Sequence, residues 1–420
     1  MRRSKLLWKI ICSHLITNLL NKIKNSPVLR LRDFRLLASA TFFESVTRGE
    51  NVVLGWVILE LTDSPFMVGL AMGIRHAPAF FLGLTAGTIS DLVDRRTLIR
   101  SLMATATLVA FLMGLLLAYG KSELWHLLII PAIGGTCHMM INTINRSFVF
   151  DLVGPENGLL GMSYLALAMR SGGLVGALVV GFVLGKWGAG AGYFAISIGC
   201  GCAFLILTLI KSPGQSAPSK KGNLSNGFYE FWQELKRNRT LSALVFIVMS
   251  VELLGFTSQA LMPSIARDIW DMGPEGLGLL NAFSSAGGIA AIAIISIFGQ
   301  KGRQGIKFII VLHVFGIALL LLGLAPTVYV AIIAIFVMSG MMALSDLFSQ
   351  TLLQRLVPND LRGRVMGAWT TAVGTAPLGS LEIGALASVL GVTAALSLHG
   401  SALILLAIVT MLTFRKLREV

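Results

Sequence analysis

The chain has 420 residues, of which 55% are hydrophobic and 13% are charged. A soluble domain carries about a quarter charged residues, so this composition, with a mean hydropathy of +0.80, excludes a soluble globule and indicates a membrane protein. The formal net charge of +14 does not indicate nucleic-acid binding, because the basic residues are scattered between apolar runs instead of gathered on a soluble fold.

Residues 1–35 are basic, and their apolar side chains recur at helical spacing between Lys5 and Lys24. This pattern predicts an amphipathic helix that lies at the membrane interface. A frayed tail that touches lipid only weakly is the alternative. A signal peptide is not expected, because Lys9, Ser13 and His14 interrupt any continuous apolar core.

Apolar runs of 18 or more residues, separated by charges or turn residues, predict twelve membrane-spanning helices. We place them at 36–60, 66–90, 97–119, 124–145, 159–185, 189–210, 241–264, 275–298, 306–325, 327–350, 365–389 and 393–414. The polar stretch 211–239 is the one long interruption and divides the spans six and six. The predicted parts are therefore a cytoplasmic segment 1–35, a six-helix bundle 36–210, a linker 211–239, and a second bundle 240–420.

Orientation follows from the positions of lysine and arginine, which are in excess in cytoplasmic connections. With the N-terminus inside, only Lys121, Lys186 and Arg267 fall in outer connections. We therefore expect both termini in the cytoplasm and the protein in a cell membrane, the inner membrane of a bacterium. The basic charge then reports topology and attraction to anionic lipid.

The two halves show an internal repeat with an offset of 203 residues. This offset superposes Pro155 on Pro358, Gly176 on Gly379, Gly181 on Gly384, and Gly188 on Gly391. One common register is expected of two parallel six-helix repeats with a substrate site between them near the membrane midplane.

Charged residues inside spans are costly and are candidate functional residues. In the first span Glu44, Arg48 and Asn51 have the spacing i, i+4, i+7, which places them on one stripe of an α-helix. Glu252, Phe256 and Gln259 repeat these offsets in the seventh span. One interpretation makes Glu252 and Glu44 proton carriers or substrate contacts; the other makes Glu44 and Arg48 a buried structural pair and Glu252 a polar anchor.

Further polar residues lie at the ends of the fourth and tenth spans. Asn142, Arg146 and Asp346 are expected either to line the substrate path as a gate or to act as interfacial caps. Another group is expected to be mainly structural, namely Arg75, Arg170 and Glu382. His138 and His313 are expected to be ordinary intramembrane polar residues, and a role in proton transfer is the alternative. The four cysteines contain no metal-ligand spacing, and neither a metal nor a cofactor is expected.

The connection between the second and third spans runs from Gly87 through Asp91 to Arg95 and Arg96. It resembles the G-x-x-x-D-R-x-G-R-R signature of the major facilitator superfamily, with Leu92 in place of the first arginine. The segment from Val357 to Met366, which contains Arg362, Gly363 and Arg364, resembles the V-P-x-x-L-R-G-R-V-M stretch of the enterobactin-exporter-like and macrolide-efflux-like branch of that superfamily. The basic and acidic side chains of both segments are expected to latch the cytoplasmic face.

This resemblance covers the chain from about residue 30 onward. It implies two six-helix bundles and a monomeric, proton-coupled exporter of an amphipathic small molecule, such as a drug or a siderophore, working by alternating access. An uptake carrier or a lysophospholipid-type flippase is the alternative within transporters, and a receptor or assembly factor without transport is the alternative of another class. Hydrolase and nucleotide-binding motifs are absent from the sequence, so an enzyme is not expected.

Overall fold

The computed structural model describes residues 26–212, 235–298, 302–356, 365, 369 and 372–419. All regular structure in these ranges is helical. Eight of the described helical segments are long and apolar enough to cross a membrane. The chain is an all-α, multi-pass membrane protein; the predicted interfacial helix before residue 26 lies outside the described residues.

The described part of the first half contains nine helical elements. They are α2 (Pro27–Arg30), α3 (Arg32–Glu44), η1 (Ser45–Gly49), α4 (Glu50–Thr62), α5 (Pro65–Leu92), α6 (Arg95–Ala118), α7 (Leu124–Val153), η2 (Pro155–Asn157) and α8 (Gly158–Thr208). The first predicted span is formed by α3, η1 and α4 in succession. The fifth and sixth predicted spans are both parts of α8, which is interrupted at the non-helical residue Gly188.

The described part of the second half follows the same order. Its elements are α10 (Arg239–Leu254), η3 (Phe256–Leu261), α11 (Met262–Ser264), η4 (Ile265–Ile269), α12 (Pro274–Phe298), α13 (Gln304–Gly323), α14 (Val328–Arg355), α16 (Ala376–Leu390), α17 (Val392–Thr413) and α18 (Arg415–Glu419). The seventh predicted span corresponds to the run from α10 to η4. Like the first span, it changes from α-helix to 3₁₀-helix near its middle.

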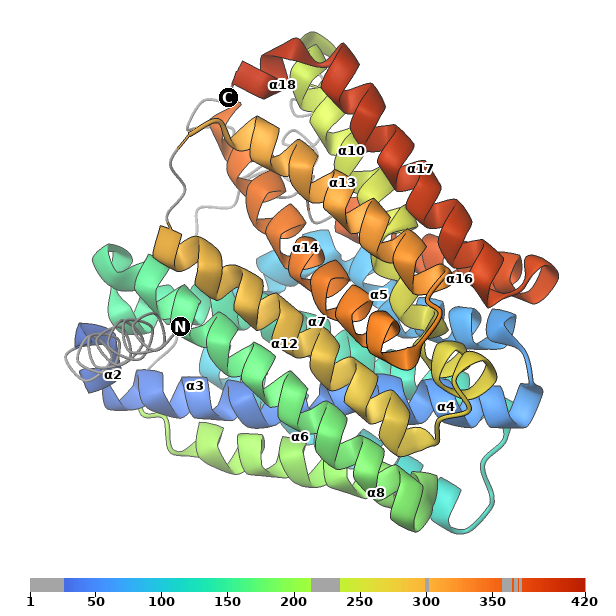
Figure 1. Ribbon diagram of the computed structural model, residues 1–420. Helices are drawn as coiled ribbons and strands as arrows, with labels where there is room; N and C mark the ends of the chain where they lie inside the picture. The colour runs from blue at the N-terminus through green and yellow to red at the C-terminus, as the bar shows by residue number, and fades with distance from the viewer. Residues whose placement is uncertain are drawn as a thin grey trace, which may run out of the picture.

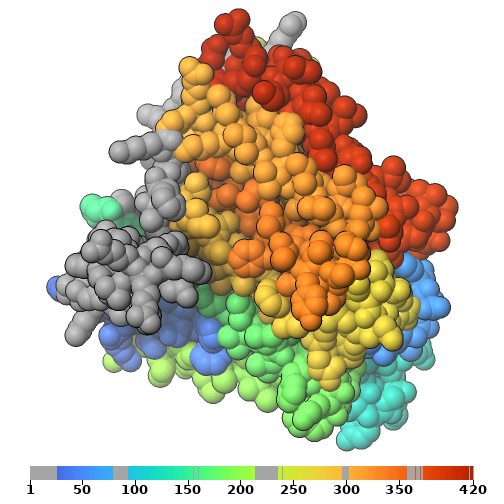
Figure 2. Space-filling model, in the orientation of Figure 1, coloured from blue at the N-terminus to red at the C-terminus, as the bar shows by residue number. Residues whose placement is uncertain are grey.

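The two halves form two groups of helices that meet mainly along two pairs of neighbours. In Figure 1, α10, α13, α14 and α17 lie together above α3, α6 and α8. The most extensive contacts between the groups are those of α8 with α12 and of α5 with α16, and α4 also contacts α11 and α12. On the face seen in Figure 2, the second half, yellow to red, lies across the first half, blue to green.

Glycines allow the backbones of these neighbours to touch. A Cβ atom on Gly181 of α8 would lie 2.7 Å from the Cα of Gly278 in α12. A Cβ atom on Gly384 of α16 would lie 3.3 Å from the Cα of Gly69 in α5. Gly181 and Gly384 are a pair in the 203-residue register, so the repeat expected from the sequence corresponds to a repeated packing contact between the halves.

One end of the molecule, which we call the closed end, is defined by Leu59, Asp63, Phe66, Arg267 and Ser388. Arg267 donates one hydrogen bond to the backbone oxygen of Leu59 (3.0 Å) and another to Asp63 Oδ1 (2.5 Å). The backbone nitrogen of Phe66 donates to the Ser388 hydroxyl at 3.0 Å. Each of these bonds joins the first half to the second.

The opposite end, which we call the linker end, is defined by Asp33, Arg96, Lys211 and Ser212. Asp33 Oδ2 accepts hydrogen bonds from the backbone nitrogens of Lys211 (3.2 Å) and Ser212 (2.8 Å) and from the Ser212 hydroxyl (2.6 Å). Arg96 Nη1 donates to the Lys211 backbone oxygen at 2.9 Å. The start of the polar linker is thus attached to the first half.

Candidate transport site

A cavity of about 210 Å³ lies between the two halves. The first half contributes residues of α4 and α5, and the second contributes residues of α10, η3, α11, α12 and α16. The described polar residues of the lining are Asn51, His76, Glu252, Thr257, Gln259, Asn281 and Ser380; the apolar ones are Met72, Phe256, Ala260, Met262, Pro263, Leu277, Val373 and Ala376. The wall therefore offers apolar surface together with several polar groups.

Glu252 is the one carboxyl-bearing residue of the described lining, which contains no lysine or arginine. It lies on α10 half a turn before that helix ends, and the residue is only 3% exposed. Within the described part of the chain, no hydrogen bond or ion pair reaches its carboxylate. The charge that acts on it through space is another acid, Asp346 of α14. A buried carboxyl without a cationic partner is costly when ionised.

The break in the seventh span positions Phe256 and Gln259 in the same cavity as Glu252. The amide nitrogen of Gln259 lies 3.8 Å from the sulfur of Met342, and the Phe256 ring meets the Phe315 ring edge to face. His399 Nδ1 hydrogen bonds to the backbone oxygen of Leu254, the last residue of α10, at 3.0 Å. This contact satisfies a carbonyl that the helix break leaves free.

In the first span, the residues expected on one stripe have three different surroundings. Glu44 lines a small chamber inside the first half, Asn51 lines the central cavity, and Arg48 packs against α8 at Gly173. The reason is η1, because a 3₁₀-helix has three residues per turn and rotates every later side chain relative to an α-helical stripe. Arg48 still acts on Glu44 through space.

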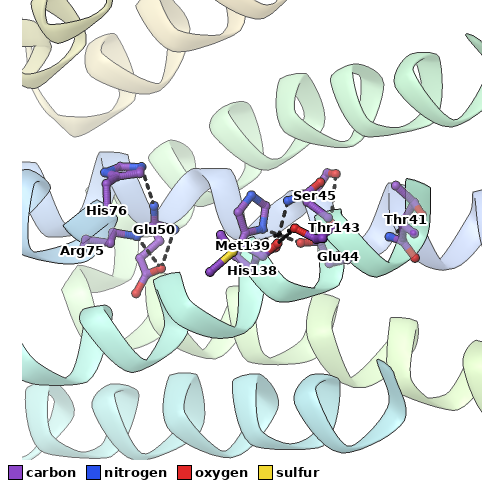
Figure 3. A network of polar contacts seen from close by, with 11 residues as sticks. Thr41, Glu44, Ser45, Glu50, Arg75, His76, His138, Met139 and Thr143 are labelled. Carbon is purple, nitrogen blue, oxygen red and sulfur yellow. Dashed lines mark hydrogen bonds and ion pairs between the residues drawn. The ribbon is translucent and has the colours of Figure 1, made fainter. Parts of the chain in front are cut away.

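The small chamber, of about 20 Å³, lies among α3, η1, α4, α5, α6, α7 and α8. Glu44, Glu50, Arg75 and His138 all line it. His138 Nδ1 lies 2.5 Å from Glu44 Oε1, and the Ser45 hydroxyl donates to Glu44 Oε2 at 3.3 Å (Figure 3). The volume of the chamber is enough for one water molecule.

The second acid of the chamber, Glu50, is bound by an arginine. Arg75 Nε and Nη2 donate to Glu50 Oε2 at 3.0 and 2.9 Å, and Arg75 Nη1 lies 3.3 Å from His76 Nε2 (Figure 3). The side chains of Glu50 and Arg75 are 9% and 4% exposed. A buried guanidinium–carboxylate pair of this kind holds α4 to α5.

The remaining residues expected along the substrate path do not line the central cavity. Asn142 of α7 donates to the backbone oxygen of His138 at 2.9 Å. Asp346 lies in α14, and the charges of Arg170 and Arg146 act on it from the first half. Arg170, from α8, lies against Gly288 of α12. Asp346, Arg146 and Arg170 therefore join the halves electrostatically without lining the described cavity wall, whereas Asn142 bonds within its own helix.

Of the residues expected to latch the cytoplasmic face, the side chains of two are described. Arg95 Nη1 forms an ion pair with Asp151 Oδ2 at 2.7 Å, which ties α6 to α7, and Arg96 binds the linker as given above. Gly87 and Asp91 lie on α5, whose side chains there are outside the described residues, as are Arg362, Gly363 and Arg364.

Sequence reasoning missed two contacts that the structure shows. His138 was expected to be an ordinary polar residue, yet it binds Glu44 from 94 positions away. Arg267 was counted only as a loop charge, yet it joins the halves at the closed end. The one signal in the sequence for the Arg267 contact was that Arg267 and Asp63 carry opposite charges at ends of spans predicted to lie on the same side of the membrane. No local pattern in the sequence links His138 to Glu44.

Comparison of the sequence with known proteins identifies the family to which the chain belongs. The model of the Major Facilitator Superfamily matches residues 37–378. The chain is similar to the enterobactin exporter EntS of Shigella flexneri, with 24% identity over 396 residues and 92% of both chains covered. It has the same identity and coverage with the enterobactin exporter EntS of Citrobacter koseri, over 402 residues.

Solved structures show the same fold. A point variant of the nucleoside transporter NupG has a TM-score of 0.75 at 13% identity and covers 91% of this chain and 100% of its own. The peptide transporter POT in complex with sulfate has a TM-score of 0.74 at 13% identity, covering 92% and 95%. A bacterial homologue of the human lysosomal transporter Spinster, inward-facing and occupied, has a TM-score of 0.72 at 14% identity, covering 92% and 97%. The relatives and the fold are those of transporters rather than enzymes, and the chain belongs to the major facilitator superfamily.

Proposed function

We propose that this transporter is a proton-coupled exporter of an amphipathic small molecule and that Glu252 is its coupling residue. The observation that carries the proposal is a buried carboxyl, in the wall of a cavity between two halves, without a cationic partner among the described residues. We propose export, and siderophores among the candidate substrates, because the relatives named above are enterobactin exporters.

Glu252 suits coupling because its surroundings can differ between the two states of an alternating-access cycle. A carboxyl packed in apolar surroundings is held neutral, whereas one that water reaches ionises. If the cavity opens and closes around Glu252, proton binding and release follow from the movement. Glu50 does not suit this role, because Arg75 already holds its carboxylate in a buried ion pair.

We propose that the linker end faces the cytoplasm and that the closed end faces the outside of the cell. The linker end carries Arg96, Lys211 and neighbouring basic side chains, whereas the outer connections contain Lys121, Lys186 and Arg267. The contacts of Arg267 and Phe66 then close the outer face. Labelling of engineered cysteines from each side of the membrane tests this topology: a cysteine beside Lys121 that is accessible only from the cytoplasm contradicts it.

The experiment has two stages. Accumulation and susceptibility of cells with and without the protein are compared across siderophores, macrolides and lipophilic cations, and a compound that responds is carried into proteoliposomes. With Glu252→Gln, we expect binding of that compound to remain, uphill transport driven by a pH gradient to be lost, and downhill exchange to persist.

The matched control is Glu60→Gln on the exposed end of α4, which removes a carboxylate from the membrane-spanning region without touching the cavity. We expect this variant to transport like the wild type. If Glu252→Gln still concentrates the compound against its gradient, Glu252 is not the coupling residue. If the wild type drives uptake instead, the protein is a carrier of the opposite direction.

A further inference from the structure

We propose that Arg48, Arg146 and Arg170 form an anion-binding site between the two halves, and that the transported molecule carries an anionic group such as a carboxylate or a sulfonate. We call these three residues the arginine cluster. The inference names a substrate class, so its role in transport rests on the proposed function. Binding of an anion to the cluster is tested without transport.

The cluster is supplied by three elements of the first half and directed toward the second half. Arg48 comes from η1, Arg146 from α7 and Arg170 from α8. The side chain of Arg48 packs against Gly173, one turn after Arg170, so both guanidinium groups lie along one face of α8. Nη1 of Arg170 lies against Gly288 of α12, which packs between α8 and α14 (Figure 1). The shared face of α8 therefore borders the interface between the halves.

The donors of the cluster are not used by the protein. Within the part of the chain that the structure describes, no hydrogen bond or ion pair reaches the guanidinium groups of Arg48, Arg146 or Arg170. Arg48 and Arg170 are half-buried with no unpartnered nitrogen fully enclosed by protein, and Arg146 is exposed. By contrast, Arg75, which acts on Arg48 through space, and Arg95 each have a carboxylate partner. Five N–H donors on each guanidinium of the cluster are thus available to a ligand.

The described acids that act on the cluster are fewer than its cations. Asp346 of α14 acts on Arg170 and Arg146, and Glu44 acts on Arg48. Both carboxylate oxygens of Glu44 already contact other side chains. Three positive charges therefore face two negative ones, and one monoanionic group brings the cluster to neutrality. Guanidinium groups also match the planar oxygens of a carboxylate with paired hydrogen bonds.

The three arginines lie at successive depths between the linker end and the central cavity. With a rise of about 1.5 Å per residue, Arg146 lies roughly 10 Å from the end of α7. Arg170 lies roughly 18 Å from the start of α8, and Arg48 roughly 24 Å from the start of α3. Asn51, on the next turn after Arg48, lines the central cavity. Intramembrane arginines in such a series mark a path for an anionic group.

The test measures binding of two probes to the purified full-length protein in nonionic detergent by isothermal titration calorimetry, at pH 7 and without a pH gradient. 2-Naphthalenesulfonate is the anion, and 2-naphthalenesulfonamide is a neutral molecule of nearly the same shape. We expect the sulfonate to bind about tenfold or more tightly than the sulfonamide, because hydrogen bonds between two charged groups are stronger than those to a neutral group.

Variants assign the binding to the cluster. Arg48→Gln and Arg170→Gln should each weaken the sulfonate about tenfold and leave the sulfonamide unchanged. Asp346→Asn should tighten the sulfonate, because it removes a carboxylate that competes for the arginines. This gain cannot come from damage to the fold, since the variant keeps all three arginines. Lys186→Gln, which removes one positive charge at an outer connection, is the matched control and should bind like the wild type.

Equal affinity for the two probes overturns the anion site, and so does sulfonate binding that Arg48→Gln and Arg170→Gln leave unchanged. Tighter binding of 2-naphthylmethylammonium than of the sulfonate also overturns it. Transport by Glu252→Gln is read separately. Loss of uphill transport in that variant, with no sulfonate binding to the wild type, removes only the anion site. Sulfonate binding as expected, with uphill transport intact in Glu252→Gln, supports the anion site and removes only the coupling residue.

Discussion

Gly188 and Gly391, related by the 203-residue repeat, adopt the same backbone conformation. Gly188 has φ 81° and ψ 178°, and Gly391 has φ 87° and ψ 156°. Each lies between the last two spans of its half, at the break in α8 and between α16 and α17. This region of backbone space is open essentially to glycine alone, so the repeat seen in the sequence is a repeat of one required conformation.

Replacing either glycine by alanine is expected to lower the free energy of unfolding by about 1–3 kcal/mol. No heavy atom lies within 4 Å of a Cβ added at either position, so the effect comes from the backbone and not from a clash. Thermal unfolding of purified Gly188→Ala and Gly391→Ala measures it. Gly201→Ala, on a regular part of α8 with one neighbour at 3.7 Å, is the control and should be neutral or stabilising.

Removing the charge of Arg267 is expected to weaken the closed end. Arg267→Gln loses the ion pair with Asp63, whose side chain is 85% exposed, so we expect a shift of only about two- to fivefold between the two conformations. Distances between spin labels placed across the closed end measure this population. Lys186→Gln, at an outer connection but away from Asp63, should leave the distances unchanged. An equal shift of the distances in Lys186→Gln would show that Arg267 has no specific role in closing this end.

The cytoplasmic latch predicted from the sequence involves Asp91 and the pair Arg362 and Arg364. Neutralising Asp91, or both arginines together, should shift the population away from the outward-open state. A charge-assisted hydrogen bond contributes about 1.5–3 kcal/mol, which changes a two-state ratio roughly tenfold or more. Distance distributions across the linker end that are identical to those of the wild type would contradict the latch.

Asp33 is expected to make the attachment of the linker depend on pH. Burial of Asp33 by itself raises its pKa, but hydrogen bonds from Ser212 and Lys211 and the charge of Arg32 outweigh this and leave the pKa below its usual value of 3.8. Because the folded-state pKa is lowered, the stabilisation is complete above about pH 4 and is lost as the pH falls through the lower folded value.

The measurement for Asp33 is hydrogen exchange at the backbone amides of Lys211 and Ser212. Asp33→Asn should speed their exchange about fivefold at neutral pH, because a hydrogen bond to a neutral group is weaker than one to a charged group. In the wild type, acidification from pH 7 to pH 5 should leave the protection of these amides unchanged. A loss of protection already at pH 6 would point to another group.

The spans were predictable from the sequence because long apolar runs leave the backbone little alternative to a helix in lipid. Asn51, Phe256 and Gln259 were named from their spacing of four or seven residues after Glu44 and Glu252, and all three line the central cavity. The separation of Glu44 from Arg48 was not predictable, since the change to a 3₁₀-helix at Ser45 depends on close packing of η1 against α8. The partner of Glu44 lies on another span, and pairing across spans is decided by tertiary packing rather than by local spacing.

The glycine contacts between the halves also bear on how the protein moves. At Gly181 with Gly278, and at Gly69 with Gly384, backbone meets backbone with no side chains interlocked between them. Two smooth surfaces of this kind can roll over one another without any change of rotamer. The halves are therefore expected to rock about these two contacts as intact bodies. The contacts stay in place during this movement, while one end of the molecule opens and the other closes.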